Sequence, residues 1–135
     1  MHFDGIMDAR SPHVLLVEDD RDTREMYAEY LSHSGMRVSA ARTGRRALES
    51  LRWSRPDIVV TDLAMPEMDG RELSRRLRSD RTTSDLPIIA VSGQLAPGER
   101  IPGADVVLEK PCEPDRLLHV IEDVLHTHAR HGRVS

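Results

Sequence analysis

Short apolar runs alternate with amphipathic segments along most of the chain. Four of these runs are uninterrupted by polar residues and cover residues 14–17, 58–60, 88–91 and 106–108, while a weaker run covers residues 36–40. Continuous apolar runs of this length are typical of strands that are buried on both faces of a parallel sheet. We therefore predict five such strands.

The segments between and after these runs carry apolar residues at helical spacing. The spacing of three and four residues occurs in 26–31, 47–51, 73–77 and 117–125. Asp20 and Thr43 are suited to cap the first two helices, and Pro114 suits the first turn of the last one. Strands and helices that alternate in this way predict a doubly wound α/β fold, a five-stranded parallel sheet with helices on both faces.

Length and composition set the class of protein. The 135 residues suit one domain, which we place at 13–128 between polar tails at 1–12 and 129–135. We expect neither a membrane-spanning segment nor a secretory leader, because no apolar run is long enough and the first residues lack an apolar core. The only cysteine is Cys112. A cytoplasmic location without membrane contact is therefore expected. The net charge of -4 disfavours nucleic acid as a direct partner.

Chemically active side chains follow four of the predicted strands. The sequence Glu18-Asp19-Asp20 follows the first strand, Asp62 ends the third, Ser92 ends the fourth, and Lys110 follows the fifth. In an open α/β sheet, ligands bind outside the carboxyl ends of the strands. Lys110 is also the only lysine, beside 18 arginines, which favours a role that needs a compact ammonium group.

The clustered carboxylates predict a cation site. Neighbouring carboxylates repel one another unless a cation lies between them, and an all-oxygen site suits Mg²⁺ beside a phosphate group. In such a setting Asp62 could act as a nucleophile that forms an aspartyl-phosphate. Lys110 could then pair with the phosphoryl oxygens, and Ser92 could donate a hydrogen bond to one of them.

Four stretches of the sequence match a known family. They are VLLVEDD at 14–20, DIVVTDLAMPEMDG at 57–70, IIAVSG at 88–93 and LEKP at 108–111. Together they resemble the receiver domains of two-component response regulators over residues 13–128. The resemblance implies a flavodoxin-like sheet with strand order 2-1-3-4-5.

The resemblance also implies roles for the site residues. Asp62 would be the phosphoacceptor, with Asp19 as a direct Mg²⁺ ligand, Glu18 acting through water, and the backbone carbonyl of Ala64 as a further ligand. Ser92 would be the switch hydroxyl and Lys110 the phosphoryl-binding lysine, followed by a cis peptide bond to Pro111.

The implied partners are proteins, and the implied role is regulatory. A sensor histidine kinase or phosphotransfer protein would donate the phosphoryl group, and an unidentified downstream protein would read the modified surface. The family pattern implies a phosphorelay regulator rather than an enzyme.

The sequence departs from the family at three places. Val107 stands where an aromatic switch residue is common, and Ala64 offers no side-chain hydrogen bond to an attacking water. The third departure is a short segment, 93–109, that contains Pro97, Gly98, Pro102 and Gly103. Proline and glycine disfavour a helix interior, so we predict that the fourth helix is short or missing across 95–104 and is replaced by a loop.

Several alternatives remain open at this stage. Asp20 could serve only as a helix cap, and the arginines of 42–55 and 70–81 could be solvated helix faces or could dock an acidic partner. A degenerate receiver that binds proteins without phosphorylation is one rival function. An aspartyl-nucleophile phosphohydrolase is another, although Ala64 stands where such enzymes place a general acid. No glycine-rich phosphate loop follows the first strand, which disfavours a nucleotide site.

Overall fold

The computed structural model describes residues 11–132. Residues 1–10 of the predicted N-terminal tail lie outside the described residues, as do residues 133–135. The elements in chain order are β1 (His13–Val17), α1 (Arg21–His33), β2 (Arg37–Ala41), α2 (Gly44–Ser50), β3 (Ile58–Asp62), α3 (Gly70–Ser79), β4 (Ile88–Ser92), β5 (Val106–Glu109) and α4 (Pro114–Gly132).

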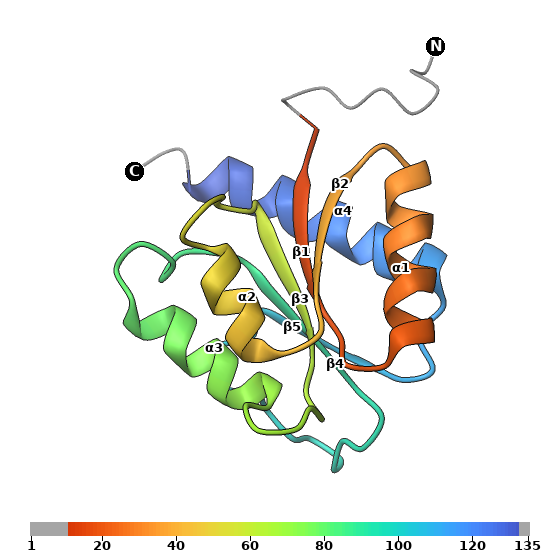
Figure 1. The fold of residues 1–135 in the computed structure, drawn as a ribbon, viewed down its shortest axis with the longest axis vertical. Coiled ribbons are helices and arrows are strands. Elements are labelled where there is room, and N and C mark those ends of the chain that lie inside the picture. The colour runs from red at the N-terminus through yellow and green to blue at the C-terminus, as the bar shows by residue number, and fades with distance from the viewer. Residues whose placement is uncertain (1–10, 133–135) are drawn as a thin grey trace.

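The five strands form one parallel sheet in the order β2-β1-β3-β4-β5 (Figure 1). All four strand pairings are parallel, with Val17 opposite Thr61 and Asp62 opposite Val91. The predicted fold class and strand order are therefore confirmed. The chain adds β2 on one side of β1 and then adds β3 on the other side, so the direction of winding reverses between β1 and β3. The carboxyl ends of these two strands lie side by side at this switch point.

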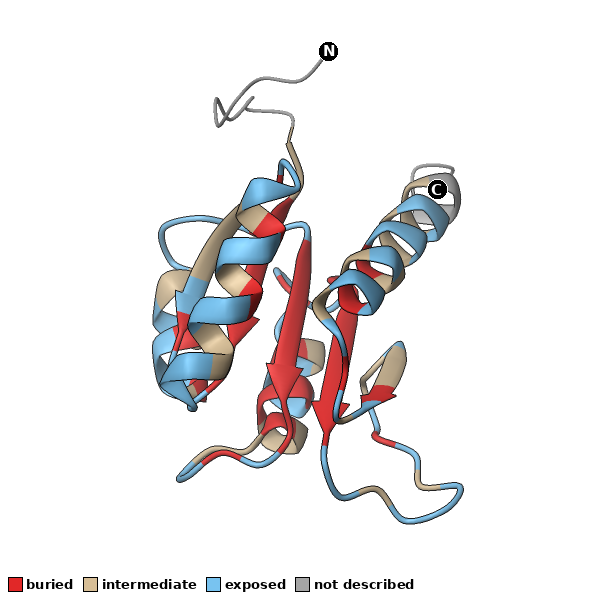
Figure 2. Ribbon diagram, turned by 90° about the vertical axis from the view of Figure 1, so that its right-hand side faces the viewer, coloured by how far each residue is buried: buried red, intermediate tan, exposed pale blue. Residues whose placement is uncertain are grey.

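Two helical layers cover the sheet. Val14 and Leu16 point to the face that α1 and α4 cover, whereas Leu15 and Val17 point to the face that α2 and α3 cover. Figure 2 shows the strands buried between helices whose outer faces are exposed. Each fully buried leucine stabilises the fold by roughly 1.5–3 kcal/mol. Successive side chains of a strand point to opposite faces of the sheet. Each continuous apolar run therefore contributes alternate residues to two cores, one on each face.

Side chains cap the starts of three helices. The Asp20 carboxylate accepts a hydrogen bond from the Thr23 backbone N–H at 2.9 Å, and the Thr43 hydroxyl accepts one from the Arg46 N–H at 3.0 Å. Both caps were predicted from the sequence. Asp69 caps α3 in the same way, through the Glu72 N–H at 2.9 Å. Such caps satisfy backbone donors that the first turn of a helix leaves free.

The segment between β4 and β5 contains turns instead of a helix, throughout residues 93–105. The predicted loss of the fourth helix is confirmed. Ile101 from this segment is buried against Leu63 and Ala90, and Val107 packs on the same small cluster. An ion pair of 2.5 Å between Arg71 and Glu99 also joins the segment to α3.

Helix α4 extends into the segment that was assigned to the polar C-terminal tail. It extends to Gly132, so residues 129–132, expected to be part of a polar tail, are helical. The chain has no proline or glycine between 115 and 131 to stop the helix, which explains the difference. Across the described range, no helix is both long and apolar enough to cross a membrane.

Candidate functional site

Three carboxylates meet at the carboxyl ends of β1 and β3. Glu18 follows β1 directly, Asp62 ends β3, and the two strands are hydrogen-bonded neighbours. Carboxylate oxygens of Glu18, Asp19 and Asp62 lie within 4.8 Å of one another. The sheet topology thus brings together the acidic residues that the sequence analysis selected.

Asp62 is held by a tightly packed strand end. Its side chain is only 6% exposed, and the next residue, Leu63, donates a backbone hydrogen bond of 3.0 Å to the Val91 carbonyl on β4. Gly70, the first residue of α3, donates its N–H to the Leu63 carbonyl at 2.9 Å. A Cβ atom at Gly70 would overlap the Asp62 backbone carbonyl, so this close approach requires glycine.

The first two acidic residues after β1 lie in different environments. Glu18 is buried, and its backbone N–H donates to the Ala41 carbonyl at 3.0 Å, whereas Asp19 is exposed. The Arg24 guanidinium donates to the backbone carbonyls of Glu18 at 2.9 Å and Asp19 at 3.3 Å. These bonds from α1 fix the loop that carries both carboxylates.

Lys110 completes the cluster from the far side. Its Nζ atom lies 3.3 Å from Asp62 Oδ2 and 3.4 Å from Glu18 Oε1. Its backbone N–H donates to the Ser92 carbonyl at 2.7 Å, and the Lys110–Pro111 peptide bond is cis, as the resemblance implied. The only lysine of the chain therefore bridges the carboxylates that follow two different strands.

The charges in this site are unbalanced. Burial, together with the neighbouring Asp62 charge, raises the pKa of Glu18 to about 7, although the hydrogen bond from the Asp20 N–H and the charge of Lys110 both lower it. Burial by itself would lower the pKa of Lys110, but the charges of Glu18 and Asp62 outweigh it and raise that pKa above its ordinary value. Three carboxylates facing one ammonium group leave a negative site, which a divalent cation would neutralise.

The donor atoms at this edge suit magnesium. They are the carboxylate oxygens of Glu18, Asp19 and Asp62. Asp19 is exposed, which leaves room for water molecules on a bound ion. Mg²⁺ prefers oxygen ligands and usually keeps several of its waters. Ala64, two residues after Asp62, is exposed and has only a methyl side chain, so its backbone carbonyl is the ligand atom it can offer.

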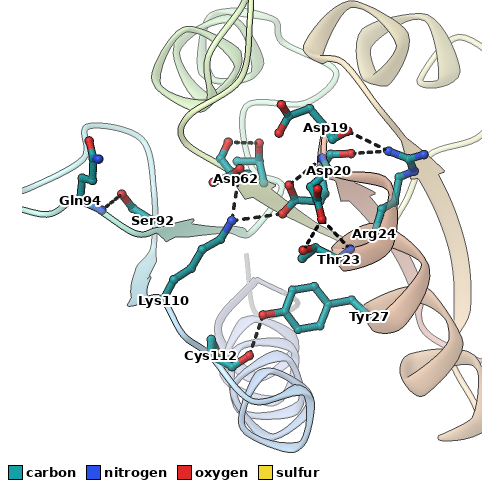
Figure 3. Close-up of polar contacts among 12 residues, drawn as sticks. Asp19, Asp20, Thr23, Arg24, Tyr27, Asp62, Ser92, Gln94, Lys110 and Cys112 are labelled. Atoms are coloured by element: carbon teal, nitrogen blue, oxygen red, sulfur yellow. Dashed lines mark hydrogen bonds and ion pairs between the residues drawn. The ribbon is translucent and has the colours of Figure 1, made fainter.

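Ser92 lies beside this cluster, with its hydroxyl bonded elsewhere. Ser92 is the last residue of β4 and directly follows Val91, which pairs with Asp62 in the sheet. Its side chain is buried. Its Oγ atom accepts a hydrogen bond of 3.1 Å from the Gln94 backbone N–H (Figure 3). The structure thus places the predicted switch hydroxyl between the acidic cluster and the loop that replaces the fourth helix.

Sequence reasoning missed two residues that support the site. Arg24 was not singled out, and Tyr27 was assigned only to the apolar face of the first helix. The Tyr27 hydroxyl donates a hydrogen bond of 2.6 Å to the Cys112 carbonyl, two residues after Lys110, and burial raises its pKa to about 12. A buried tyrosine hydroxyl needs a polar partner. The presence of a tyrosine on the apolar face of the helix was therefore a signal in the sequence. The sequence pattern could not identify the Cys112 carbonyl as the hydrogen-bond partner.

Comparison with known proteins agrees with this geometry. The family model described as "Response regulator receiver domain" matches residues 14–122. A relative named response regulator MprA, from Mycolicibacterium vanbaalenii, is 42% identical over 109 residues, which are 78% of this chain and 46% of the relative. The chain therefore spans about half the length of the curated relatives it matches.

Solved structures show the same fold. The chemotaxis response regulator CheY4 of Vibrio cholerae is 30% identical, with a TM-score of 0.79, and the match covers 84% of this chain and 98% of that one. The receiver domain of the sensor histidine kinase PA1611 from Pseudomonas aeruginosa is 25% identical, with a TM-score of 0.78 and coverage of 86% and 98%. That structure is described as having a magnesium ion coordinated in its active site cleft.

Proposed function

Because the chain belongs to the receiver-domain family of two-component response regulators, we propose that it accepts a phosphoryl group on Asp62 in a Mg²⁺-dependent reaction. A sensor histidine kinase or a phosphotransfer protein donates the group. The observation that carries this proposal is the contact of one buried carboxylate, Asp62, with both an acidic cluster and the only lysine.

Residues at the strand ends are assigned to the metal. Asp19, Asp62 and the backbone carbonyl of Ala64 would hold Mg²⁺ directly and Glu18 would hold it through water, and the raised pKa of Glu18 supports the need for a cation there. When bound, the ion neutralises negative charge on the carboxylates and on the incoming phosphoryl group.

The transfer forms one bond and breaks another. A carboxylate oxygen of Asp62 attacks phosphorus as the bond from phosphorus to the donor's imidazole nitrogen breaks, and the electron pair of that bond stays on the nitrogen. Lys110, which lies 3.3 Å from the carboxylate, pairs with the phosphoryl oxygens as a point charge. Ser92 donates its hydroxyl hydrogen to another of these oxygens.

We assign the signalling change to Ser92 and the segment that follows it. The Ser92 hydroxyl accepts from the Gln94 N–H, so a turn of this side chain toward a phosphoryl oxygen would break that bond. The segment 93–105 would then rearrange and present a different surface to a downstream protein. Val107 has no aromatic ring to rotate, so in this proposal the loop carries the change.

One specific alternative has structural support. The valine at 107 and the absence of a helix in 93–105 would also suit a degenerate receiver that binds its partner without phosphorylation. A phosphohydrolase has less support, because Ala64 provides no general acid two residues after Asp62. The same experiment separates the proposal from both alternatives.

The test is phosphorylation by a small donor. The protein is incubated with acetyl phosphate and Mg²⁺, and its intact mass is measured, with Asp62→Asn and an EDTA sample as controls. We expect one added phosphoryl group, absent from both controls. No adduct, together with no effect of beryllofluoride on the amide spectrum, would support the degenerate receiver. Sustained turnover of a generic phosphate ester that is lost in Asp62→Asn would support the hydrolase.

A further inference from the structure

Six arginines on the α2–α3 side of the sheet have side chains without a hydrogen bond or ion pair to any described residue. All six are exposed. They are Arg42, Arg45, Arg46, Arg52, Arg75 and Arg81, which we call the arginine face. Unpaired guanidinium groups gathered on one side give that side a positive potential, although the whole chain carries a net charge of -4.

A groove crosses this face. Helices α2 and α3 pack on the same side of the sheet and lie next to each other (Figure 1). The hollow between them has a volume of about 770 Å³ and is lined on the α2 side by Leu48, Leu51 and Arg52 and on the α3 side by Arg76 and Arg81, with smaller polar residues. The half-buried leucines supply apolar surface, while Arg52 and Arg81 supply unpaired charges from opposite sides.

An exposed tryptophan lies beside the same helix. Trp53, in the turn after α2, is 85% exposed, and it lines a second hollow of about 430 Å³ together with Arg42 and Arg46. Leaving an indole ring in water is unfavourable. Tryptophan and arginine, with tyrosine, are enriched at the energetic centres of protein interfaces. This arrangement is therefore typical of a surface that a partner covers.

We propose that the arginine face is a docking surface for an acidic, amphipathic segment of a partner protein. Carboxylates of that segment pair with the unpaired arginines, and its apolar side chains cover Leu48, Leu51 and Trp53. The surface excludes Asp62, so the proposal goes beyond phosphoryl acceptance and does not depend on it.

A protein partner fits this face better than nucleic acid does. Glu49 is exposed among the arginines of α2, and Asp80 lines the groove. The evenly spaced charges of a phosphate backbone would meet these like charges, whereas a peptide can place its few carboxylates away from both. A domain with a pI near 6.0 is also a poor binder of a polyanion. An amphipathic segment can instead present its carboxylates to the arginines and its apolar side chains to the groove.

The test uses the single tryptophan as a reporter. The probe is a synthetic peptide of Glu and Leu with leucines at helical spacing and no aromatic residue, and the control peptide has the same composition in scrambled order. We expect the patterned peptide to shift Trp53 emission to shorter wavelength in a saturable way. Added salt should weaken its binding, because exposed ion pairs are screened, and the scrambled peptide should bind more weakly.

Two charge-matched double variants locate the site. Arg52→Glu with Arg81→Glu should raise the dissociation constant for the patterned peptide at least about tenfold. Arg100→Glu with Arg116→Glu changes the net charge equally at two other exposed, unpaired arginines, and it should change the constant by less than about twofold. Circular dichroism melting curves establish that both variants remain folded.

Four results would overturn the proposal. The first is the absence of saturable binding of the patterned peptide to the wild type, and the second is an equal loss of affinity in both double variants. The third is tighter binding of a DNA duplex that is lost only in the Arg52→Glu, Arg81→Glu variant, which would assign the face to nucleic acid. The fourth is concentration-dependent self-association lost only in that variant, which would make the occupant a second copy of this chain.

Discussion

The Nζ atom of Lys110 lies 3.3 Å from the Oδ2 atom of Asp62. About a third of the chain separates these residues. Asp62 ends β3 and Lys110 directly follows β5, and the carboxyl ends of both strands lie at the same edge of the sheet. The ammonium group offsets part of the repulsion between Asp62 and Glu18. The same ion pair therefore stabilises the folded protein and places a positive charge beside the proposed phosphoacceptor, Asp62.

Removal of the ammonium group should destabilise the metal-free protein. With Lys110→Met, Asp62 and Glu18 face each other uncompensated, at a cost of about 1–2 kcal/mol because Lys110 is partly exposed. Urea unfolding in EDTA measures this loss, and Mg²⁺ should restore more stability in the variant than in the wild type. Lys110→Arg is the matched control and should keep most of the stability. Identical urea midpoints for Lys110→Met and wild type would contradict this prediction.

Glu18→Gln should change the pH dependence of stability without metal. The pKa of Glu18 is about 7 in the folded protein against 4.5 for a free side chain, so the folded state binds more protons between these values. Stability from this group is present at low pH and is lost as the pH rises through 7. In EDTA at pH 8 we expect the variant to melt roughly 4 °C or more above wild type, with a much smaller difference at pH 5. Equal differences at both pH values would refute the assignment.

Asp19 and Asp20 are adjacent, exposed carboxylates with different expected roles. Asp19→Asn should weaken Mg²⁺ binding at least about tenfold, because Asp19 lies in the carboxylate cluster. Asp20→Asn preserves the helix cap and should change Mg²⁺ affinity by less than about threefold. Isothermal titration calorimetry measures both. If the two variants lost affinity equally, Asp19 would have no specific role as a ligand.

The Tyr27 hydroxyl should contribute to stability. Tyr27→Phe removes its hydrogen bond to the Cys112 carbonyl and leaves that carbonyl without this partner, so we expect a loss of about 1–2 kcal/mol in urea unfolding. Tyr30→Phe removes a hydroxyl from an exposed position of the same helix and should cost less than about 0.5 kcal/mol. Equal effects would mean that the buried hydrogen bond contributes nothing specific.

Gly70 should not tolerate a methyl group. A Cβ atom there would overlap the Asp62 carbonyl oxygen and crowd Leu63, so Gly70→Ala should cost at least about 2 kcal/mol and slow phosphoryl acceptance. At Gly93 the added atom would meet only Lys110 carbons at 3.9 Å, and Gly93→Ala should leave stability within about 0.5 kcal/mol. Thermal melting and the intact-mass assay measure the two effects.

The fold and the outline of the site could be predicted from local patterns. Continuous apolar runs indicated buried parallel strands, and strand-end positions selected Glu18, Asp62 and Lys110, because parallel strands bring their carboxyl ends to one edge. Pro97 and Gly98 with their neighbours predicted the missing helix, because proline and glycine destabilise a helix whatever packs against it. The polar tail was placed from residue 129, although residues 129–132 are helical, because polar residues alone do not stop a helix.

The environment of each group was decided only by the tertiary structure. The sequence presents Glu18 and Asp19 as equals, but packing buries one and exposes the other. The Tyr27–Cys112 hydrogen bond joins residues 85 positions apart, and the groove between α2 and α3 exists because two helices lie next to each other. Burial, pairing and pKa depend on which elements meet in space. The sequence by itself therefore determined which elements form and which side chains end them, and the packed structure determined which of those side chains are buried, paired or free.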